Sequence, residues 1–185
     1  MKKIMILIAA MLVLAGCSKE AATTTSGDNN SDNPKASETA AEVKTETPTE
    51  GFEFVYNNVT IPMNVDVTQV LEELGECSDY FEAPSCAFQG LDKIYYYPGF
   101  EVSTYPKEDK DYISSVNLLD DSVATDKGIY LGAALEEVVA AYGEDCTKTN
   151  GAYIYTLGET RLTFILEEDS VIGITYAAIV EGLNN

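Results

Sequence analysis

The chain has 185 residues, with 31 acidic and 11 basic side chains, a formal net charge of -20, four cysteines and no histidine. Without an imidazole there is no Ser-His-Asp or Cys-His nucleophile pair and no histidine-containing zinc site. The surplus of negative charge repels phosphate backbones and anionic headgroups, which argues against nucleic acid and against polybasic membrane contacts. We therefore expect the partner to be neutral or cationic.

Residues 1–16 have the composition of an export signal. Lys2 and Lys3 precede an apolar run over residues 4–14, which is too short to span a bilayer as a permanent helix. The sequence Leu14-Ala15-Gly16-Cys17 that follows resembles the lipobox of bacterial lipoproteins. The resemblance implies cleavage before Cys17, lipidation of its sulfur, an extracytoplasmic location and membrane contact through the lipid anchor alone. The alternative is an ordinary secreted protein with a chance cysteine.

The rest of the chain divides into a tether and a domain. Residues 17–50 are rich in small polar and acidic residues and contain no aromatic residue, so they cannot bury enough surface to offset the entropy of ordering. We predict that they form a disordered acidic tether. Residues 51–185 contain every Tyr and Phe and are long enough for one core.

Two amphipathic helices are predicted, with the same pattern 68 residues apart. The first lies between Asp66, an N-cap with Gln69 at the reciprocal capping position, and Gly75, a stop signal. Its apolar residues follow helical spacing: Val67, Val70, Leu71 and Leu74. The second ends at Gly143, and its corresponding residues are Leu135, Val138, Val139 and Tyr142. The pattern favours an internal duplication, and the alternative is chance similarity.

Each helix is followed by three predicted strands joined by hairpin turns. They cover residues 93–97, 100–105 and 113–118 in the first copy, and 152–156, 161–166 and 171–177 in the second. A hairpin closed by Asn57-Asn58 precedes the first helix. The predicted fold is α+β. Two tandem helix-plus-three-strand units, about 59–121 and 127–178, form one curved antiparallel sheet with both helices on one face and solvent on the other.

This order of elements, over residues 59–178, resembles the β-lactamase-inhibitor-protein-like superfamily, whose tandem units form a curved sheet. The segment Gly132 to Gly143, with Val171 to Tyr176, is also similar to small envelope-assembly lipoproteins that carry a glycine, helix, glycine, strands module. The first resemblance implies that the open face of the sheet binds another protein.

Tyrosine is the most unusual feature of the composition, with twelve in the chain. The candidate partner-binding residues are Tyr95, Tyr96, Tyr97, Tyr105, Tyr153 and Tyr155. Because side chains alternate along a strand, either Tyr96 or the pair Tyr95 and Tyr97 points to the open face. Aligning the copies by tyrosines and aligning them by glycines give opposite answers. The alternative for most of these residues is core or rim packing.

After lipidation of Cys17, three cysteines remain, so at most one intramolecular disulfide forms in an oxidising compartment. We expect Cys77 to pair with Cys86, because residues 78–85 between them are predicted to form a loop that can fold back. The alternative is three reduced thiols. A catalytic thiol is not expected, because no basic residue adjoins these cysteines.

Acidic clusters at residues 108–111, 120–126 and 167–169 lie near predicted turns and lack EF-hand spacing, so we interpret them as solvated charges rather than a metal site. No nucleotide-binding motif and no cofactor are predicted. The leading hypothesis is a non-catalytic, lipid-anchored domain that binds an envelope or secreted protein or peptide on its open sheet face. The alternative is a module for cell-wall glycan or a small cationic ligand, and a third hypothesis is a hydrolase that uses two carboxylates.

Overall fold

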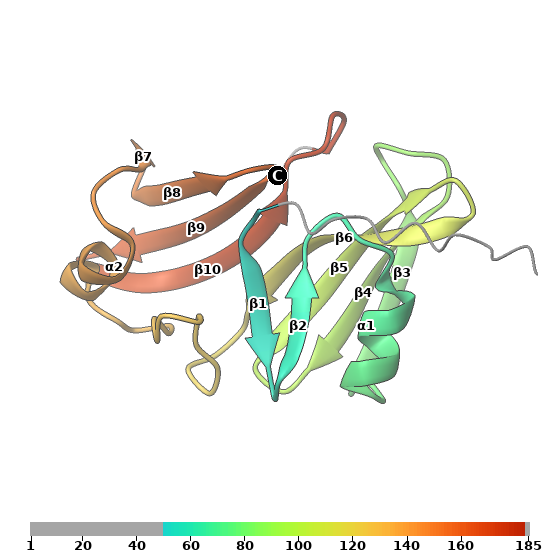
Figure 1. The fold of residues 1–185 in the computed structure, drawn as a ribbon, viewed down its shortest axis with the longest axis horizontal. Helices are drawn as coiled ribbons and strands as arrows, with labels where there is room; N and C mark the ends of the chain where they lie inside the picture. The colour runs from blue at the N-terminus through green and yellow to red at the C-terminus, as the bar shows by residue number, and fades with distance from the viewer. Residues whose placement is uncertain (1–49, 184–185) are drawn as a thin grey trace, which may run out of the picture. The chain divides into compact units, whose positions relative to one another are not determined.

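Figure 1 shows the computed structural model, which describes residues 50–183. The predicted signal, Cys17 and the tether up to residue 49 lie outside the described residues. Within residues 50–183, neither helix has the length and apolar character needed to cross a bilayer.

The described residues form two short helices and ten strands. The helices are α1 (Val67–Leu74) and α2 (Leu135–Tyr142). The strands are β1 (Glu53–Tyr56), β2 (Val59–Pro62), β3 (Asp79–Pro84), β4 (Leu91–Tyr97), β5 (Phe100–Lys107), β6 (Lys110–Leu118), β7 (Thr147–Thr149), β8 (Ala152–Leu157), β9 (Thr160–Glu167) and β10 (Ser170–Ala178).

Eight strands form one antiparallel sheet in the order β3-β4-β5-β6-β10-β9-β8-β7, and β1 pairs with β2 in a separate hairpin. The two halves of the sheet meet where β6 pairs with β10. The α+β class and the single antiparallel sheet are confirmed. The sheet also contains β3 and β7 at its two edges, where the sequence predicted only three strands after each helix. Residues 79–84, for which the sequence predicts a loop, pair with β4 along their whole length.

The helix ends follow the predicted capping signals with one exception. Asp66 accepts a hydrogen bond from the Thr68 backbone N–H at 3.0 Å, and α1 ends at Gly75, whose φ of 78° suits glycine. Gln69 does not complete a capping box, because its amide donates to the Glu73 carboxylate at 2.8 Å. The prediction of reciprocal capping at this helix was therefore wrong.

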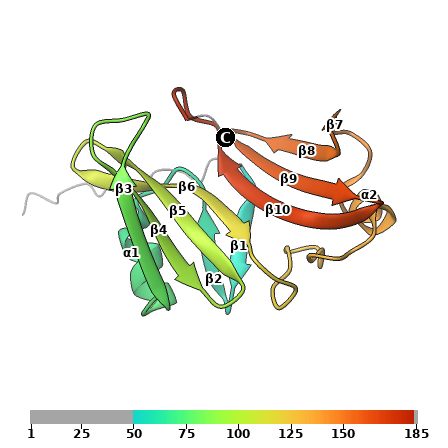
Figure 2. The same ribbon diagram turned by 180° about the vertical axis from the view of Figure 1, so that it is seen from behind.

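One face of the sheet carries the hydrophobic core. Side chains from β5, β6, β9 and β10 on this face join the buried residues of both helices, Val67, Val70 and Val138, in a single cluster. Figure 2, seen from behind, shows the sheet in front of the helices and the β1–β2 hairpin. The hydrophobic effect therefore holds both helices against the same side of the sheet.

The β1–β2 hairpin packs over the junction of the two halves. Its turn residues, Asn57 and Asn58, both have positive φ, 48° and 69°, as a type I′ turn requires. The fully buried Phe54 ring lies 5.0 Å from the Phe100 ring on β5 and 5.7 Å from the Tyr176 ring on β10. The hairpin thus contacts both halves of the sheet through one side chain.

Candidate functional site

The sheet face opposite the helices is the candidate site, and we call it the open face. Its side chains alternate with the core residues of each strand, and most are half-buried or exposed. Neither described helix packs on it (Figure 2). Its central members come from four neighbouring strands: Glu101 and Ser103 on β5, Ser115 and Asn117 on β6, Thr175 and Ala177 on β10, and Arg161 and Thr163 on β9.

Tyr96 is the one member of the Tyr95-Tyr96-Tyr97 run that lies on the open face, where it is opposite Glu101 and half-buried. Tyr95 and Tyr97 pack against the core on the helix side. Tyr153 and Tyr155 also pack there, so both pairs of tyrosines share the helix side, as the alignment of the two predicted units by tyrosines requires. The alignment by glycines fails because Gly99 is the second residue of its two-residue turn, whereas Gly158 is the first residue of its turn.

Three of the candidate tyrosines are buried in the structure. Tyr97, Tyr105 and Tyr155 are at most 5% exposed. The Tyr105 hydroxyl donates to Asn64 Oδ1 at 2.6 Å, which satisfies its buried polar group. Burial raises the pKa of Tyr97 to about 12, so this side chain stays a neutral hydroxyl. Tyr105 shares the strand face of Glu101 and Ser103, but it is buried beneath Phe88, whose ring lies 5.1 Å away. Of the six candidates, Tyr96 is therefore the one that stays accessible on the open face.

The two ends of the open face are apolar. Phe81 on the edge strand β3 is 54% exposed and stands opposite Ile94, next to Tyr96 on the same face. At the other end, Ile165 is exposed and Ile154 half-buried. Exposed aromatic and aliphatic side chains around a polar centre are typical of a protein-recognition surface.

The polar centre contains a hydrogen-bonded chain across the junction of the halves. Thr175 Oγ1 donates to Asn117 Oδ1 at 2.8 Å, and Asn117 Nδ2 donates to Glu101 Oε1 at 2.9 Å. The chain links β10, β6 and β5 and fixes which way the Asn117 amide points. Since Asn117 uses one donor on Glu101, that carboxylate is partly satisfied within the sheet.

Arg161 lies beside this chain in a hollow of about 360 Å³. The hollow has the size of a small-ligand site but is open to solvent. The side chains that line it with Arg161 carry no formal charge: Ser115, Asn117, Ile154, Thr163, Thr175 and Ala177. Within residues 50–183 Arg161 forms no ion pair, and its covered Nε has no hydrogen-bond partner. Sequence reasoning missed this residue, although it is the only arginine of the chain.

A second hollow, of about 400 Å³, adjoins the first at Ser115. It lies between the open face of β4 to β6, the loop that holds Cys86, and Leu183, the last described residue. Asp92 lines it, and the covered Oδ1 of this carboxylate has no hydrogen-bond partner among the described residues. The open face therefore holds an unpaired carboxylate oxygen and an unpaired guanidinium nitrogen in neighbouring hollows.

The carboxyl groups with a lowered pKa lie outside these hollows. The hydrogen bond from Lys110 and that from the Thr68 backbone lower the pKa of Asp66 to about 2. Hydrogen bonds from Ser122 lower the pKa of Asp120. A general acid at neutral pH needs the opposite shift, so neither group suits the hydrolase hypothesis.

The three cysteines of the described residues are free, with Cys77 and Cys146 half-buried and Cys86 exposed. Strand β3 separates Cys77 from Cys86. Six extended residues span about 20 Å, whereas a disulfide needs Cα atoms within about 7 Å. The expected Cys77–Cys86 bond is therefore incompatible with β3, and three thiols, the alternative considered, are what the structure has.

Two of the predicted acidic clusters occupy hairpin turns. Glu108 has a φ of 57°, and Glu168 and Asp169 have φ of 48° and 63°, all in the left-handed region. In the third cluster, Asp126 accepts a hydrogen bond from the Tyr142 hydroxyl at 2.9 Å. Within residues 50–183, no group of three acidic or cysteine side chains is placed to hold a metal ion.

No protein-family model, curated protein sequence or solved structure matches this chain. The resemblance to the β-lactamase-inhibitor-protein-like superfamily stays a prediction.

Proposed function

We propose that this chain is a lipid-anchored, extracytoplasmic interaction domain that binds a protein or peptide on the open face and is not an enzyme. The observation that carries the proposal is the unequal treatment of the two sheet faces. Both helices and a hairpin cover one face, while eight strands present the other with apolar ends and a polar centre. A monomeric domain gains nothing in stability from leaving an aromatic side chain such as Phe81 on an uncovered face.

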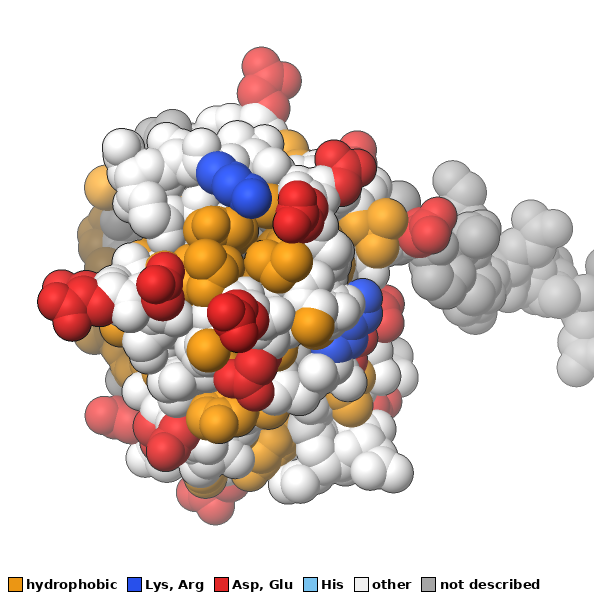
Figure 3. All heavy atoms as spheres, turned by 90° about the vertical axis from the view of Figure 1, so that its left-hand side faces the viewer, with side chains coloured by type: hydrophobic (Ala, Val, Ile, Leu, Met, Phe, Trp, Pro, Cys, Tyr) orange, Lys and Arg blue, Asp and Glu red, His pale blue; other side chains and the backbone are white. Residues whose placement is uncertain are grey.

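The acidic surface supports a basic or neutral partner. Figure 3 shows one side of the molecule, on which acidic side chains surround a group of hydrophobic ones and outnumber the basic side chains. Residues 51–185 contain 24 acidic and 6 basic side chains, a net charge of -18, so the domain would attract a basic partner at long range and repel envelope anions.

The lipid anchor in this proposal rests on residues 14–17 alone. Expression of the chain in a bacterial host with labelled fatty acid tests it. Cys17→Ala is expected to abolish the label and release the chain from the membrane fraction, because no second acyl attachment site is proposed. A labelled Cys17→Ala variant would contradict the lipobox interpretation.

An internal duplication, also part of the proposal, is supported by matched hydrogen bonds. The Tyr97 hydroxyl donates to the carbonyl of Gly75, which ends α1, at 3.3 Å. The Tyr155 hydroxyl donates to the carbonyl of Gly143, which ends α2, at 2.8 Å. In each half, a core tyrosine on the second strand after the helix thus binds the helix stop residue.

Matched β-bulges support the duplication as well. The register of the β5–β6 pair shifts by one residue at Ser114, and that of the β9–β10 pair shifts at Ile172. These positions are 58 residues apart, the same distance that separates Tyr97 from Tyr155. The residue before each helix also forms a backbone bridge with the last strand of its half. Bulges are kept as features of a fold, so their agreement weighs against chance.

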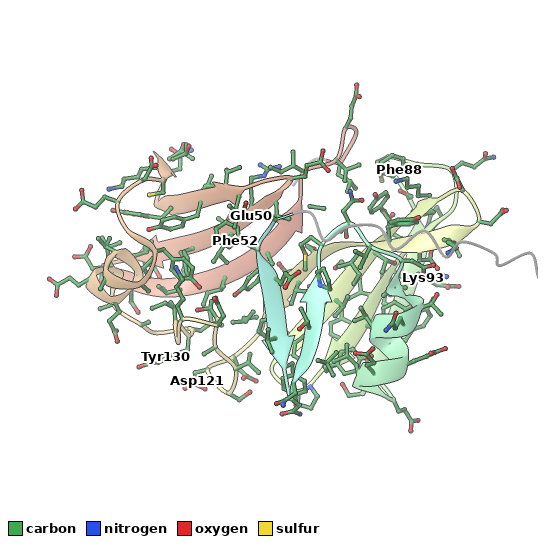
Figure 4. The ribbon with its side chains drawn as sticks, viewed as in Figure 1. Glu50, Phe52, Phe88, Lys93, Asp121 and Tyr130 are labelled. Atoms are coloured by element: carbon green, nitrogen blue, oxygen red, sulfur yellow. The ribbon has the colours of Figure 1, made fainter. Side chains whose placement is uncertain are left out.

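Affinity capture tests the interaction proposal. The full chain is immobilised and exposed to envelope and secreted fractions of its host, beside the variants Tyr96→Ala and Tyr130→Ala. Tyr130 is the matched control, since it is 41% exposed but lies on the loop before α2 (Figure 4). We expect Tyr96→Ala to weaken retention of a specific protein by about tenfold or more, as for an aromatic hot spot. Equal retention by all three chains would remove the open face from the binding site.

A small cationic ligand is the second candidate, and the unpaired Oδ1 of Asp92 favours it. An amine in the 400 Å³ hollow would pair with this carboxylate beside the hydroxyls of Ser103 and Thr104. In the same capture experiment, Asp92→Asn distinguishes the two candidates. Release of a small basic solute from the parent chain, but not from Asp92→Asn, would favour this second function.

A further inference from the structure

Arg161 is an isolated positive charge in an acidic protein. It is the only arginine of the chain, and the net charge is -20. Even so, it is in neither of the ion pairs formed within residues 50–183, which are Lys93–Asp111 and Lys110–Asp66. An arginine that served stability alone would be expected to meet one of the many carboxylates available.

The side chains paired with Arg161 in the sheet carry no charge. Its opposite residue is Ala177 on β10, with Ser115 next on β6, and on β8 it is Thr156. Among the central members of the open face, the acidic residue is Glu101 on β5, three strand spacings or about 14 Å from β9. Glu101 already accepts a hydrogen bond from Asn117. Arg161 therefore has no anionic neighbour in its own hollow.

The other groups in the hollow are suited to an anion. The hydroxyls of Ser115 and Thr163 make no hydrogen bond within the described residues, so both can donate to a ligand. The Thr175 hydroxyl donates to Asn117, and this hydrogen bond holds both side chains in place where the hollow borders β6. One guanidinium with two neutral donors matches a ligand that carries a single negative charge.

We infer that Arg161 is the anchor for one carboxylate group of the bound protein or peptide, held by the guanidinium and the hydroxyls of Ser115 and Thr163. The inference rests on the proposed function and adds the chemistry of the contact. A planar carboxylate accepts two parallel hydrogen bonds from a guanidinium. A phosphate dianion is disfavoured, because one positive charge balances half of its charge and the rest of the chain repels it. The partner is thus basic or neutral overall and presents one carboxylate to the centre of the sheet.

The experiment uses the full-length chain labelled with nitrogen-15. Because Arg161 is the only arginine, its Nε–H group gives a single side-chain signal of its kind that needs no assignment. Four titrants are used. The first is the tripeptide alanine-glutamate-alanine with both termini blocked, and the second is the same peptide with glutamine in place of glutamate. The third is trialanine with a free C-terminal carboxylate, and the fourth is inorganic phosphate. The first two differ in one charge, and the third carries its carboxylate at the chain end.

A saturable shift of the Arg161 Nε–H signal is expected with the glutamate tripeptide, with trialanine, or with both, which identifies the source of the carboxylate. The glutamine analogue is expected to leave the signal unchanged. In Arg161→Gln, followed through the backbone signals of Thr163 and Thr175, affinity is expected to fall about tenfold or more. Lys148→Gln, which removes the same charge from the edge strand β7, is expected to bind as the parent does.

The inference is overturned if the glutamine analogue or phosphate shifts the Nε–H signal as strongly as the carboxylate titrant that binds, or if neither the glutamate tripeptide nor trialanine gives a saturable shift. Since these measurements are made on the parent chain, they stand even if Arg161→Gln fails to fold. Failure here together with Tyr96-dependent capture would leave the open face as a protein site with a different anchor. A carboxylate response without capture would instead contradict the proposed protein partner.

Discussion

Phe54→Ala is expected to destabilise both halves of the sheet at once. The Phe54 side chain is fully buried, and its ring contacts Phe100 in the first half and Tyr176 in the second. Truncation of a buried phenylalanine to alanine costs about 3–5 kcal/mol, through lost transfer free energy and the cavity left behind. With two aromatic partners lost, we expect about 4 kcal/mol, a large part of the roughly 5–15 kcal/mol that stabilises a domain.

Urea unfolding measures this loss. The chain has no tryptophan, so tyrosine fluorescence reports tertiary structure and far-ultraviolet circular dichroism reports the strands. At a slope of about 2 kcal/mol per molar urea, the midpoint is expected to fall by about 2 M. Val55→Ala is the control, since this neighbour on β1 is 45% exposed and its truncation should cost less than about 0.5 kcal/mol. A loss below about 1 kcal/mol for Phe54→Ala, or separate transitions by the two probes, would refute the reasoning that the hairpin joins the halves.

Three further predictions concern single groups. The pKa of Asp66 is lowered from its ordinary value of 3.8 to about 2 in the folded chain. The stability that the ionised Asp66 carboxylate adds to the fold is therefore fully present above pH 3.8 and is lost as the pH falls toward 2. Asp66→Ala should therefore cost about 1 kcal/mol at neutral pH and less in acid urea titrations. By the same unfolding assay, Tyr155→Phe should cost about 1 kcal/mol and Tyr97→Phe less, because their hydrogen bonds to the helix ends measure 2.8 and 3.3 Å. Without reductant, Cys86 should react with a thiol reagent faster than Cys77, since Cys86 is exposed, and an unreactive pair would indicate a disulfide.

The parts of the fold that were predictable are those with local signals. The first helix needs only its apolar spacing between Asp66 and Gly75, and the Asn57-Asn58 turn needs only two residues that tolerate positive φ. The six inner strands alternate because one face of each is buried, and their observed bounds lie within a few residues of those predicted. These elements can be predicted without knowing which other segments of the chain pack against them.

The edge strand β3 was not predictable in this way. Its residues are almost all exposed on both faces, so hydrophobic alternation is absent and only pairing with β4 makes it a strand. The interpretation of residues 79–84 as a loop produced the mistaken disulfide, because only a loop would bring Cys77 and Cys86 together. One missed strand therefore led to a second error.

The candidate site was only partly readable from the sequence. Alternation correctly split the tyrosine run, but the choice of face depends on where each glycine falls in its turn. Gly99 is the second residue of the turn after Tyr97, whereas Gly158 is the first residue of the corresponding turn, so alignment by glycines shifts the comparison by one residue and reverses the face. Arg161 carried one usable signal, its uniqueness in an acidic chain. Its lack of an acidic partner can be recognised only once the strand order places β9 beside β10 and β6, where no carboxylate lies opposite Arg161.

If the two halves are copies, each residue of one half has a corresponding residue in the other. The two faces of the sheet then differ in how similar these corresponding side chains are. On the helix side, Tyr97 corresponds to Tyr155, and each makes the same kind of hydrogen bond. On the open face, Tyr96 corresponds to Ile154, and the Glu101–Asn117 pair has Thr163 and Thr175 in its place.

Packing against a helix restricts the core positions to similar side chains, whereas an uncovered face has no such restriction. If the halves are copies, duplication would provide a sheet wide enough for a partner, and the unlike side chains on its two halves would give that surface a direction. A partner that presents its carboxylate to Arg161 in the second half meets Tyr96 and Phe81 in the first. Substitutions that exchange open-face side chains between corresponding positions of the two halves, and leave the core residues unchanged, should therefore alter which partner binds without altering the fold.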